Sequence, residues 1–75
     1  AELMQGVYRI LVICLGEPPA SFDVRIRDDK NELKASGTYT PREFFNEFVG
    51  MNLDDYVSVI NAPTQDKPYL HAFTV

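Results

Sequence analysis

The sequence has no tryptophan, one histidine and one cysteine among its 75 residues. Because Cys14 has no second cysteine to pair with, an internal disulfide is excluded, and the absence of a signal-peptide pattern favours a reducing cytoplasm. The longest apolar run, residues 10–15, is far shorter than the roughly 20 residues that a membrane-spanning helix needs. We therefore expect a cytoplasmic chain that does not enter a membrane.

The chain is also poor in positive charge. It has 11 Asp and Glu against 7 Lys and Arg, which gives a formal net charge of −4. A surface of this sign repels phosphate backbones, so nucleic acid is not an expected partner. Apolar residues, by contrast, make up 45% of the sequence, with five Phe and four Tyr, which argues against intrinsic disorder.

The length of the chain allows one small domain or a piece of a larger one. No initiator methionine is present, and residues 72–75 have the pattern of a strand that stops abruptly. Residues 1–75 are therefore expected to be a single small domain or an excised internal segment. A folded chain of this size buries only about 60% of the surface that it exposes when unfolded, so its stability is marginal.

The first part of the chain predicts a helix from residue 3 to residue 15. Apolar side chains recur there at helical spacing in two adjacent stripes. Gly16 is a suitable C-cap, and the proline pair at 18–19 prevents continuation. A helix that is apolar on two sides needs cover on two sides, so we expect it to pack on residues outside the chain or on a second copy.

A hairpin and a capped helix are predicted next. Apolar and charged residues alternate over 22–27, turn-forming residues occupy 28–31, and a weaker strand follows over 32–37. Thr40-Pro41-Arg42-Glu43 then forms a capping box with proline at the first helical position. This box begins a short helix that ends at Gly50. Its expected apolar face consists of Phe44, Phe45, Phe48 and Val49.

The last third of the chain is predicted to be β-rich. Residues 56–60 contain tyrosine and β-branched side chains, and residues 69–75 are extended after a loop that contains two prolines. The expected order is helix, β-hairpin, short helix, strand, strand. This order indicates the α+β class.

Cys14 and His71 are the only residues that could form a cysteine–histidine dyad. A catalytic thiolate needs partial exposure and a cationic neighbour, which an apolar helix face does not provide. We therefore interpret Cys14 as a buried structural thiol and assign no catalytic role to His71.

Clusters of charged residues have equally simple structural interpretations. Asp54, Asp55 and Asp66 match no calcium loop and are expected in solvated turns, so no metal site is predicted. Glu43 has its capping role, and Glu47 lies one turn further along the same helix. A mixed hairpin face, interleaved with acidic residues, is expected for Arg25, Arg27, Lys30 and Lys34. No cofactor site is predicted.

Three stretches resemble one family in the family's own order. They are Tyr8-Arg9-Ile10-Leu11 through Gly16-Glu17-Pro18-Pro19, then Thr40-Pro41-Arg42-Glu43-Phe44-Phe45, and finally Leu53-Asp54-Asp55-Tyr56-Val57-Ser58-Val59-Ile60-Asn61-Ala62-Pro63-Thr64 with Asp66-Lys67-Pro68-Tyr69. Together they are similar to the bleomycin hydrolase and aminopeptidase C family of papain-like cysteine peptidases. The chain resembles an internal segment of that family.

This resemblance implies a fragment of a papain-like fold from a cytoplasmic enzyme that removes N-terminal residues from peptides. Members are typically homo-hexamers whose catalytic Cys, His and Asn would lie outside this segment. Neither Cys14 nor His71 has the sequence context of the family's catalytic residues, so no catalytic site is carried over and the chain alone is expected to be inactive. Its partners would be the remainder of the parent or another copy. The alternative is a free-standing small acidic α+β protein-interaction module.

Overall fold

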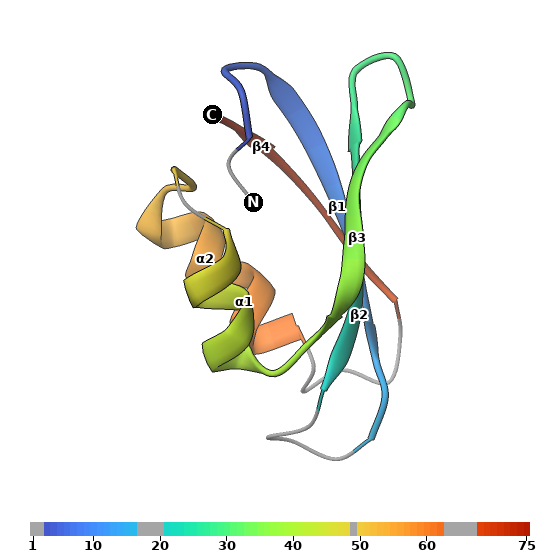
Figure 1. Cartoon of the computed structure of the whole chain (residues 1–75), viewed down its shortest axis with the longest axis vertical. Coiled ribbons are helices and arrows are strands. Elements are labelled where there is room, and N and C mark those ends of the chain that lie inside the picture. The colour runs from blue at the N-terminus through green and yellow to red at the C-terminus, as the bar shows by residue number, and fades with distance from the viewer. Residues whose placement is uncertain (1–2, 17–20, 49, 63–67) are drawn as a thin grey trace.

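The computed structural model describes residues 3–16, 21–48, 50–62 and 68–75. The described chain forms one antiparallel sheet of four strands, in the order β3-β2-β1-β4, and both helices lie on the same side of it (Figure 1). In chain order the elements are β1 (Val7–Cys14), β2 (Phe22–Asp28), β3 (Leu33–Tyr39), α1 (Pro41–Glu47), α2 (Leu53–Asn61) and β4 (Tyr69–Thr74). The predicted α+β class is confirmed.

The first predicted element is wrong, because residues 7–14 form strand β1 and not a helix. Tyr8, Ile10 and Val12 are buried, whereas Val7 and Arg9 are exposed and Leu11 is half-buried. This alternation is the period of a strand with one covered face. The helix prediction relied on a second apolar stripe beside the first. A strand that is paired on both sides can also have apolar residues on its second face, so this stripe does not distinguish a helix from a strand. The expected proline stop at 18–19 lies outside the described residues.

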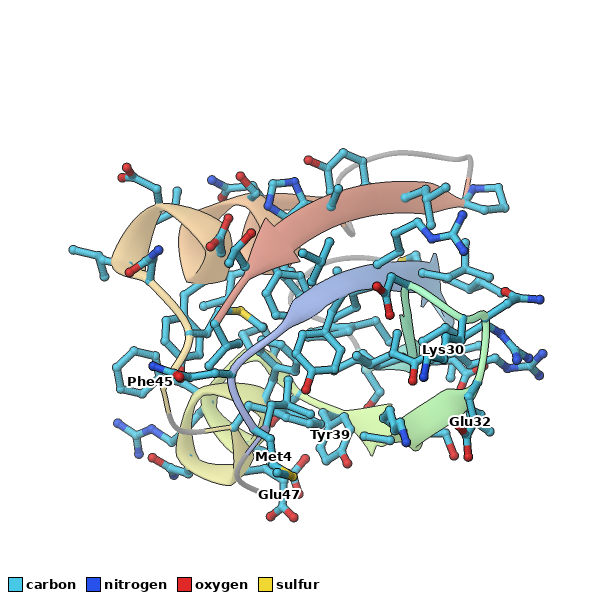
Figure 2. The ribbon with its side chains drawn as sticks, turned by 90° about the horizontal axis from the view of Figure 1, so that it is seen from above. Met4, Lys30, Glu32, Tyr39, Phe45 and Glu47 are labelled. Carbon is cyan, nitrogen blue, oxygen red and sulfur yellow. The ribbon has the colours of Figure 1, made fainter. Side chains whose placement is uncertain are left out.

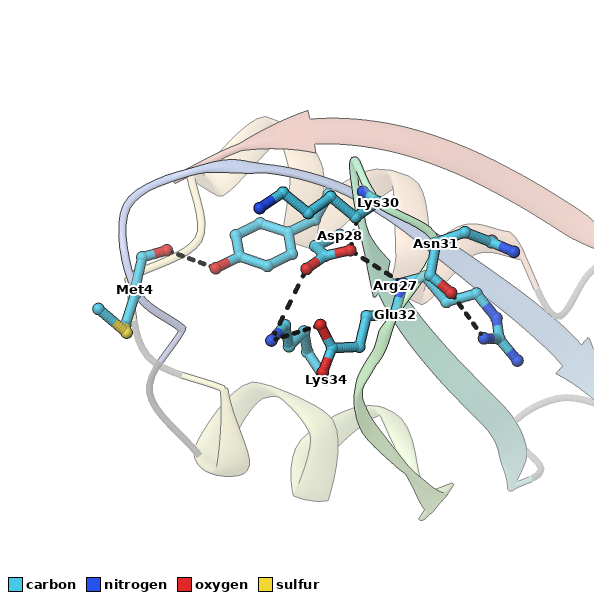
Figure 3. A network of polar contacts seen from close by, with 8 residues as sticks. Met4, Arg27, Asp28, Lys30, Asn31, Glu32 and Lys34 are labelled. Carbon is cyan, nitrogen blue, oxygen red and sulfur yellow. Dashed lines mark hydrogen bonds and ion pairs between the residues drawn. The ribbon is translucent and has the colours of Figure 1, made fainter.

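The hairpin prediction is confirmed by β2 and β3, which pair antiparallel with an irregularity between Ile26 and Arg27. Its turn is organised by Asp28, whose carboxylate accepts 2.9 Å hydrogen bonds from the backbone N–H groups of Lys30 and Glu32 (Figure 3). The bond from Glu32 is the main cause that lowers the pKa of Asp28. The Asp28 side chain thus fixes the backbone of the turn, and the turn holds β2 and β3 in register.

The capping box that the sequence predicts is present at the start of α1. Thr40 Oγ1 accepts a hydrogen bond from the Glu43 backbone N–H at 3.2 Å, and the Glu43 carboxylate accepts one from the Thr40 N–H at 3.0 Å. This last bond is the main cause that lowers the pKa of Glu43 below its ordinary value of 4.5. Helix α1 ends at Glu47, slightly earlier than predicted, and Val49 lies outside the described residues.

Thr40→Ala is expected to lower the free energy of unfolding by about 1 kcal/mol, because the Glu43 N–H then loses its side-chain acceptor. Urea unfolding followed by circular dichroism measures the change. Thr40→Ser is the matched control, since it keeps the hydroxyl and should retain most of the stability. Equal losses in both variants would show that the cap contributes little to the folded state.

The second wrong prediction concerns residues 56–60, which lie within helix α2 (Leu53–Asn61) and do not form a strand. The helix begins after Asn52, with Asp54 and Asp55 in its first turn, where carboxylates interact favourably with the helix dipole. Its buried side chains, Tyr56 and Val59, lie three residues apart and face the sheet. Tertiary packing of this face therefore overrides the β-propensity of the valines and isoleucine. Strand β4, by contrast, is confirmed over Tyr69–Thr74.

The core fills the space between the helices and the sheet. Phe44 of α1 is fully buried, and its ring lies 4.9 to 6.1 Å from the rings of four other aromatic residues, measured between centroids. These four are Phe22, Tyr39, Phe48 and Tyr56. The next residue, Phe45, lies at the edge of this cluster (Figure 2). Its side chain is 52% exposed, and its ring contacts only that of Tyr56 among the four. Neither helix is long and apolar enough to span a bilayer, within the residues that the structure describes.

Candidate functional site

The structure does not bring Cys14 and His71 together. His71 lies opposite Ile10 in the β1–β4 register, four residues along β1 from Cys14, which corresponds to about 13 Å at the usual strand rise. Cys14 Sγ donates instead to the carbonyl oxygen of Gly16 at 2.6 Å. The predicted buried thiol is wrong in one respect, because Cys14 is only half-buried at the end of a strand.

His71 forms a cluster with Asp55 and Tyr69 that the sequence analysis did not foresee. Its Nε2 lies 2.7 Å from Asp55 Oδ1, and its Nδ1 lies 3.3 Å from the Tyr69 hydroxyl. With Nε2 donating to the carboxylate, Nδ1 accepts from the hydroxyl. This resembles the base and orienting acid of a catalytic site, but among the described residues the imidazole has no hydrogen bond to a thiol or a serine hydroxyl. The cluster ties α2 to β4.

The acidic residues do not assemble into a metal site in the described part of the chain, where no group of three or more potential ligands occurs. Asp54 and Asp55 sit in the first turn of α2, and Asp55 is engaged with His71. Asp66 lies outside the described residues. Glu43 belongs to the capping box, and the charge of Glu47 adds to burial in raising the pKa of Tyr39.

Some basic residues of the hairpin lie next to acidic ones, as predicted for a face of mixed charge. Lys34 lies 3.7 Å from Asp28 and 3.5 Å from Glu32, beside the turn that holds Lys30 (Figure 3). Arg25 lies 3.7 Å from Asp23. The basic partner of each pair is exposed and the distances are long, so each pair contributes little to stability.

A cluster of arginines on the uncovered face of the sheet was missed by the sequence analysis. Arg9 of β1 lies directly opposite Arg27 of β2, and Leu11 lies between Arg25 and Leu70 of the neighbouring strands. Together with Asn31 they line a shallow hollow of about 210 Å³, which we call the arginine hollow. Because residues 3–15 were predicted to be helical, Arg9 could not be placed beside the hairpin. The alternation of Tyr8, Ile10 and Val12 is the signal that would have found it.

The whole chain, residues 1–75, matches the model of the Peptidase C1-like family. It is 50% identical over 74 residues to aminopeptidase C of Listeria innocua and 51% identical to aminopeptidase C of Lactococcus lactis subsp. cremoris, with 99% of this chain and 17% of each relative covered. Aminopeptidase G of Lactobacillus delbrueckii subsp. lactis is 42% identical over 63 residues, which cover 84% of this chain and 14% of the relative. No solved structure matches significantly.

These matches confirm the resemblance that the sequence analysis identified. They extend across nearly the entire chain, yet the chain spans only 17% of the length of the aminopeptidases C. The 75 residues therefore belong to the Peptidase C1-like family and correspond to a segment of its aminopeptidase C members.

Proposed function

We propose that this chain is a non-catalytic structural segment of a papain-like cysteine aminopeptidase that removes N-terminal residues from peptides. The observation that carries the proposal is the match of 99% of the chain, at 50% identity, to only 17% of aminopeptidase C from Listeria innocua. The partners of Cys14 and His71 support it, since each side chain is engaged away from the other. The catalytic Cys, His and Asn of the parent then lie outside these residues.

In the parent, a thiolate attacks the peptide carbonyl while histidine acts as base and acid and asparagine orients it. The parent is cytoplasmic and homo-hexameric in this proposal, and the segment contacts the rest of the parent or another copy. Exposed apolar side chains on several elements support such contacts, because a neighbouring part of the parent would cover them. Leu53 is 70% exposed, Leu70 61% and Phe45 52%. Neither nucleic acid nor a membrane is a partner of the segment.

The isolated chain is expected to show no turnover of aminoacyl fluorogenic substrates, because it lacks the nucleophile, the base and the orienting residue. The longer protein encoded by the source gene should cleave the same substrates. Cys14→Ala in the isolated chain is the control for contamination. Saturable activity that disappears in that variant would contradict the proposal and make Cys14 a nucleophile.

The alternative is a free-standing acidic α+β interaction module. It is favoured by the continuous core that the described residues bury between the sheet and the helices. Sequencing the source gene on both sides decides between the two: a cysteine motif upstream and a histidine motif downstream support the peptidase segment. A gene that encodes these 75 residues alone supports the module.

A further inference from the structure

The uncovered face of the sheet concentrates positive charge on a chain of net charge −4. On β1 and β2, three arginines share this face with one acidic residue, Asp23. Arg9 and Arg27 are direct cross-strand neighbours, and like charges in that position repel each other. Because folding the sheet forces this repulsion, an anion on the same face would relieve it.

Only part of this charge is compensated within the described residues. Arg25 pairs with Asp23 at 3.7 Å, and Arg27 Nη1 donates to the Asn31 carbonyl oxygen at 3.1 Å. The guanidinium of Arg9 has no hydrogen bond or ion pair with any described residue. The arginine hollow therefore presents guanidinium donors to solvent, and their planar geometry suits a carboxylate.

The other side of the hollow is apolar. Leu11 and Leu70 are cross-strand neighbours that line it, and Leu70 is 61% exposed. On the same face of β1, beyond Arg9, Val7 is 53% exposed. A ligand that matches the face thus needs a carboxylate next to aliphatic groups, and it extends further than the hollow itself.

We propose that the arginine hollow binds a peptide segment in which carboxylate side chains alternate with aliphatic ones. The carboxylates lie between Arg9 and Arg27, and the aliphatic side chains pack on Leu11 and Leu70. This inference is separate from the proposed function, because it holds for a segment of a peptidase and for an interaction module alike.

The same charges fit a nucleic acid less well. Proteins that bind single strands stack bases on aromatic side chains. In the described strands, every aromatic residue is on the face that packs against the helices, as the burial pattern and register show. These residues are Tyr8, Phe22, Tyr39, Tyr69 and Phe73. The net negative charge of the chain also repels a polyanion.

The test uses acetyl-Leu-Glu-Val-Glu-Leu-amide at millimolar concentration and follows the Leu11 and Leu70 methyl signals and the arginine Nε–H signals by NMR. Titration should shift these signals, and the matched peptide with Gln in place of both Glu should bind about tenfold more weakly. Arg9→Gln and Arg27→Gln should each weaken binding of the Glu peptide by about fivefold to tenfold. Arg42→Gln removes the same charge from exposed α1 and should change binding less than about twofold.

Four results would overturn the proposal. Equal binding of the Glu and Gln peptides, or equal effects of Arg42→Gln and Arg9→Gln, would show that no carboxylate is recognised at the hollow. Binding of a ten-nucleotide oligothymidylate with the same arginine dependence and greater affinity would assign the face to nucleic acid. A dimer in sedimentation that Arg9→Gln dissociates would make a second copy the occupant. Arg9 and Arg27 line a surface hollow and Arg42 is exposed on α1, so each replacement should leave the fold intact, which the amide spectrum checks.

Discussion

Phe44→Ala is expected to remove a large share of the stability of this chain. The Phe44 side chain is fully buried, with the rings of Phe22 and Phe48 among its neighbours. Truncating a buried phenylalanine costs about 3 to 5 kcal/mol. A domain of this length has a total of about 4 to 11 kcal/mol. Urea unfolding monitored by far-ultraviolet circular dichroism measures the loss.

Phe45→Ala is the matched control, because it removes the same side chain one residue further along α1. Phe45 is 52% exposed, and its ring lies 5.0 Å from that of Tyr56. We expect a loss of about 1 kcal/mol for this partial contact. If the two variants had equal unfolding midpoints, α1 would not present Phe44 to the core.

Ile10→Asn is expected to destabilise the chain by about 4 kcal/mol. Ile10 is fully buried in the central strand β1, between Ile26 of β2 and His71 of β4. The change removes apolar contacts in the middle of the core and buries an amide group for which the surrounding apolar side chains offer few partners. Loss of amide-signal dispersion by NMR and a lower urea midpoint would report it.

Arg9→Asn is the companion variant, since it introduces the same side chain at the adjacent exposed position. A strand predicts opposite outcomes at the two positions, because successive side chains point to opposite faces. We expect the Arg9 variant to lie within about 0.5 kcal/mol of the parent chain. Comparable losses at both positions would instead indicate an element buried on both sides.

The parts of the fold that the sequence predicted are those with local signals. The helix at 41–47 is defined by its capping box, whose two hydrogen bonds join residues only three apart. The hairpin is defined by alternation and by a turn in which Asp28 satisfies nearby backbone groups. Neither inference required knowledge of what lies across the core.

The two elements that were predicted wrongly from the sequence depend on contacts between residues that are distant along the chain. Residues 7–14 carry apolar side chains at both helical and strand spacing, and their pairing with β2 and β4 decides between the two. Residues 53–61 have β-branched side chains, but burial of Tyr56 and Val59 on the sheet selects a helix. In both segments, tertiary packing decides among the local alternatives.

The candidate sites follow from these two elements, so they could not be predicted either. Arg9 reaches Arg27 only when residues 7–14 form a strand beside the hairpin. Asp55 reaches His71 only when residues 53–61 form a helix on the face of β4. Cys14 and His71 are separated along the sheet, whereas the sequence analysis had placed Cys14 on an apolar helix face.

The strand order β3-β2-β1-β4 has a consequence for how the chain folds. Strands β1 and β2 are joined by residues 15–21, whereas β1 and β4 are separated by residues 15–68. Loop-closure entropy makes the second pairing costlier by about 2 kcal/mol. The three-stranded meander of β1, β2 and β3 is therefore favoured to form first, and the strand that carries His71 is the last part of the sheet to be put in place.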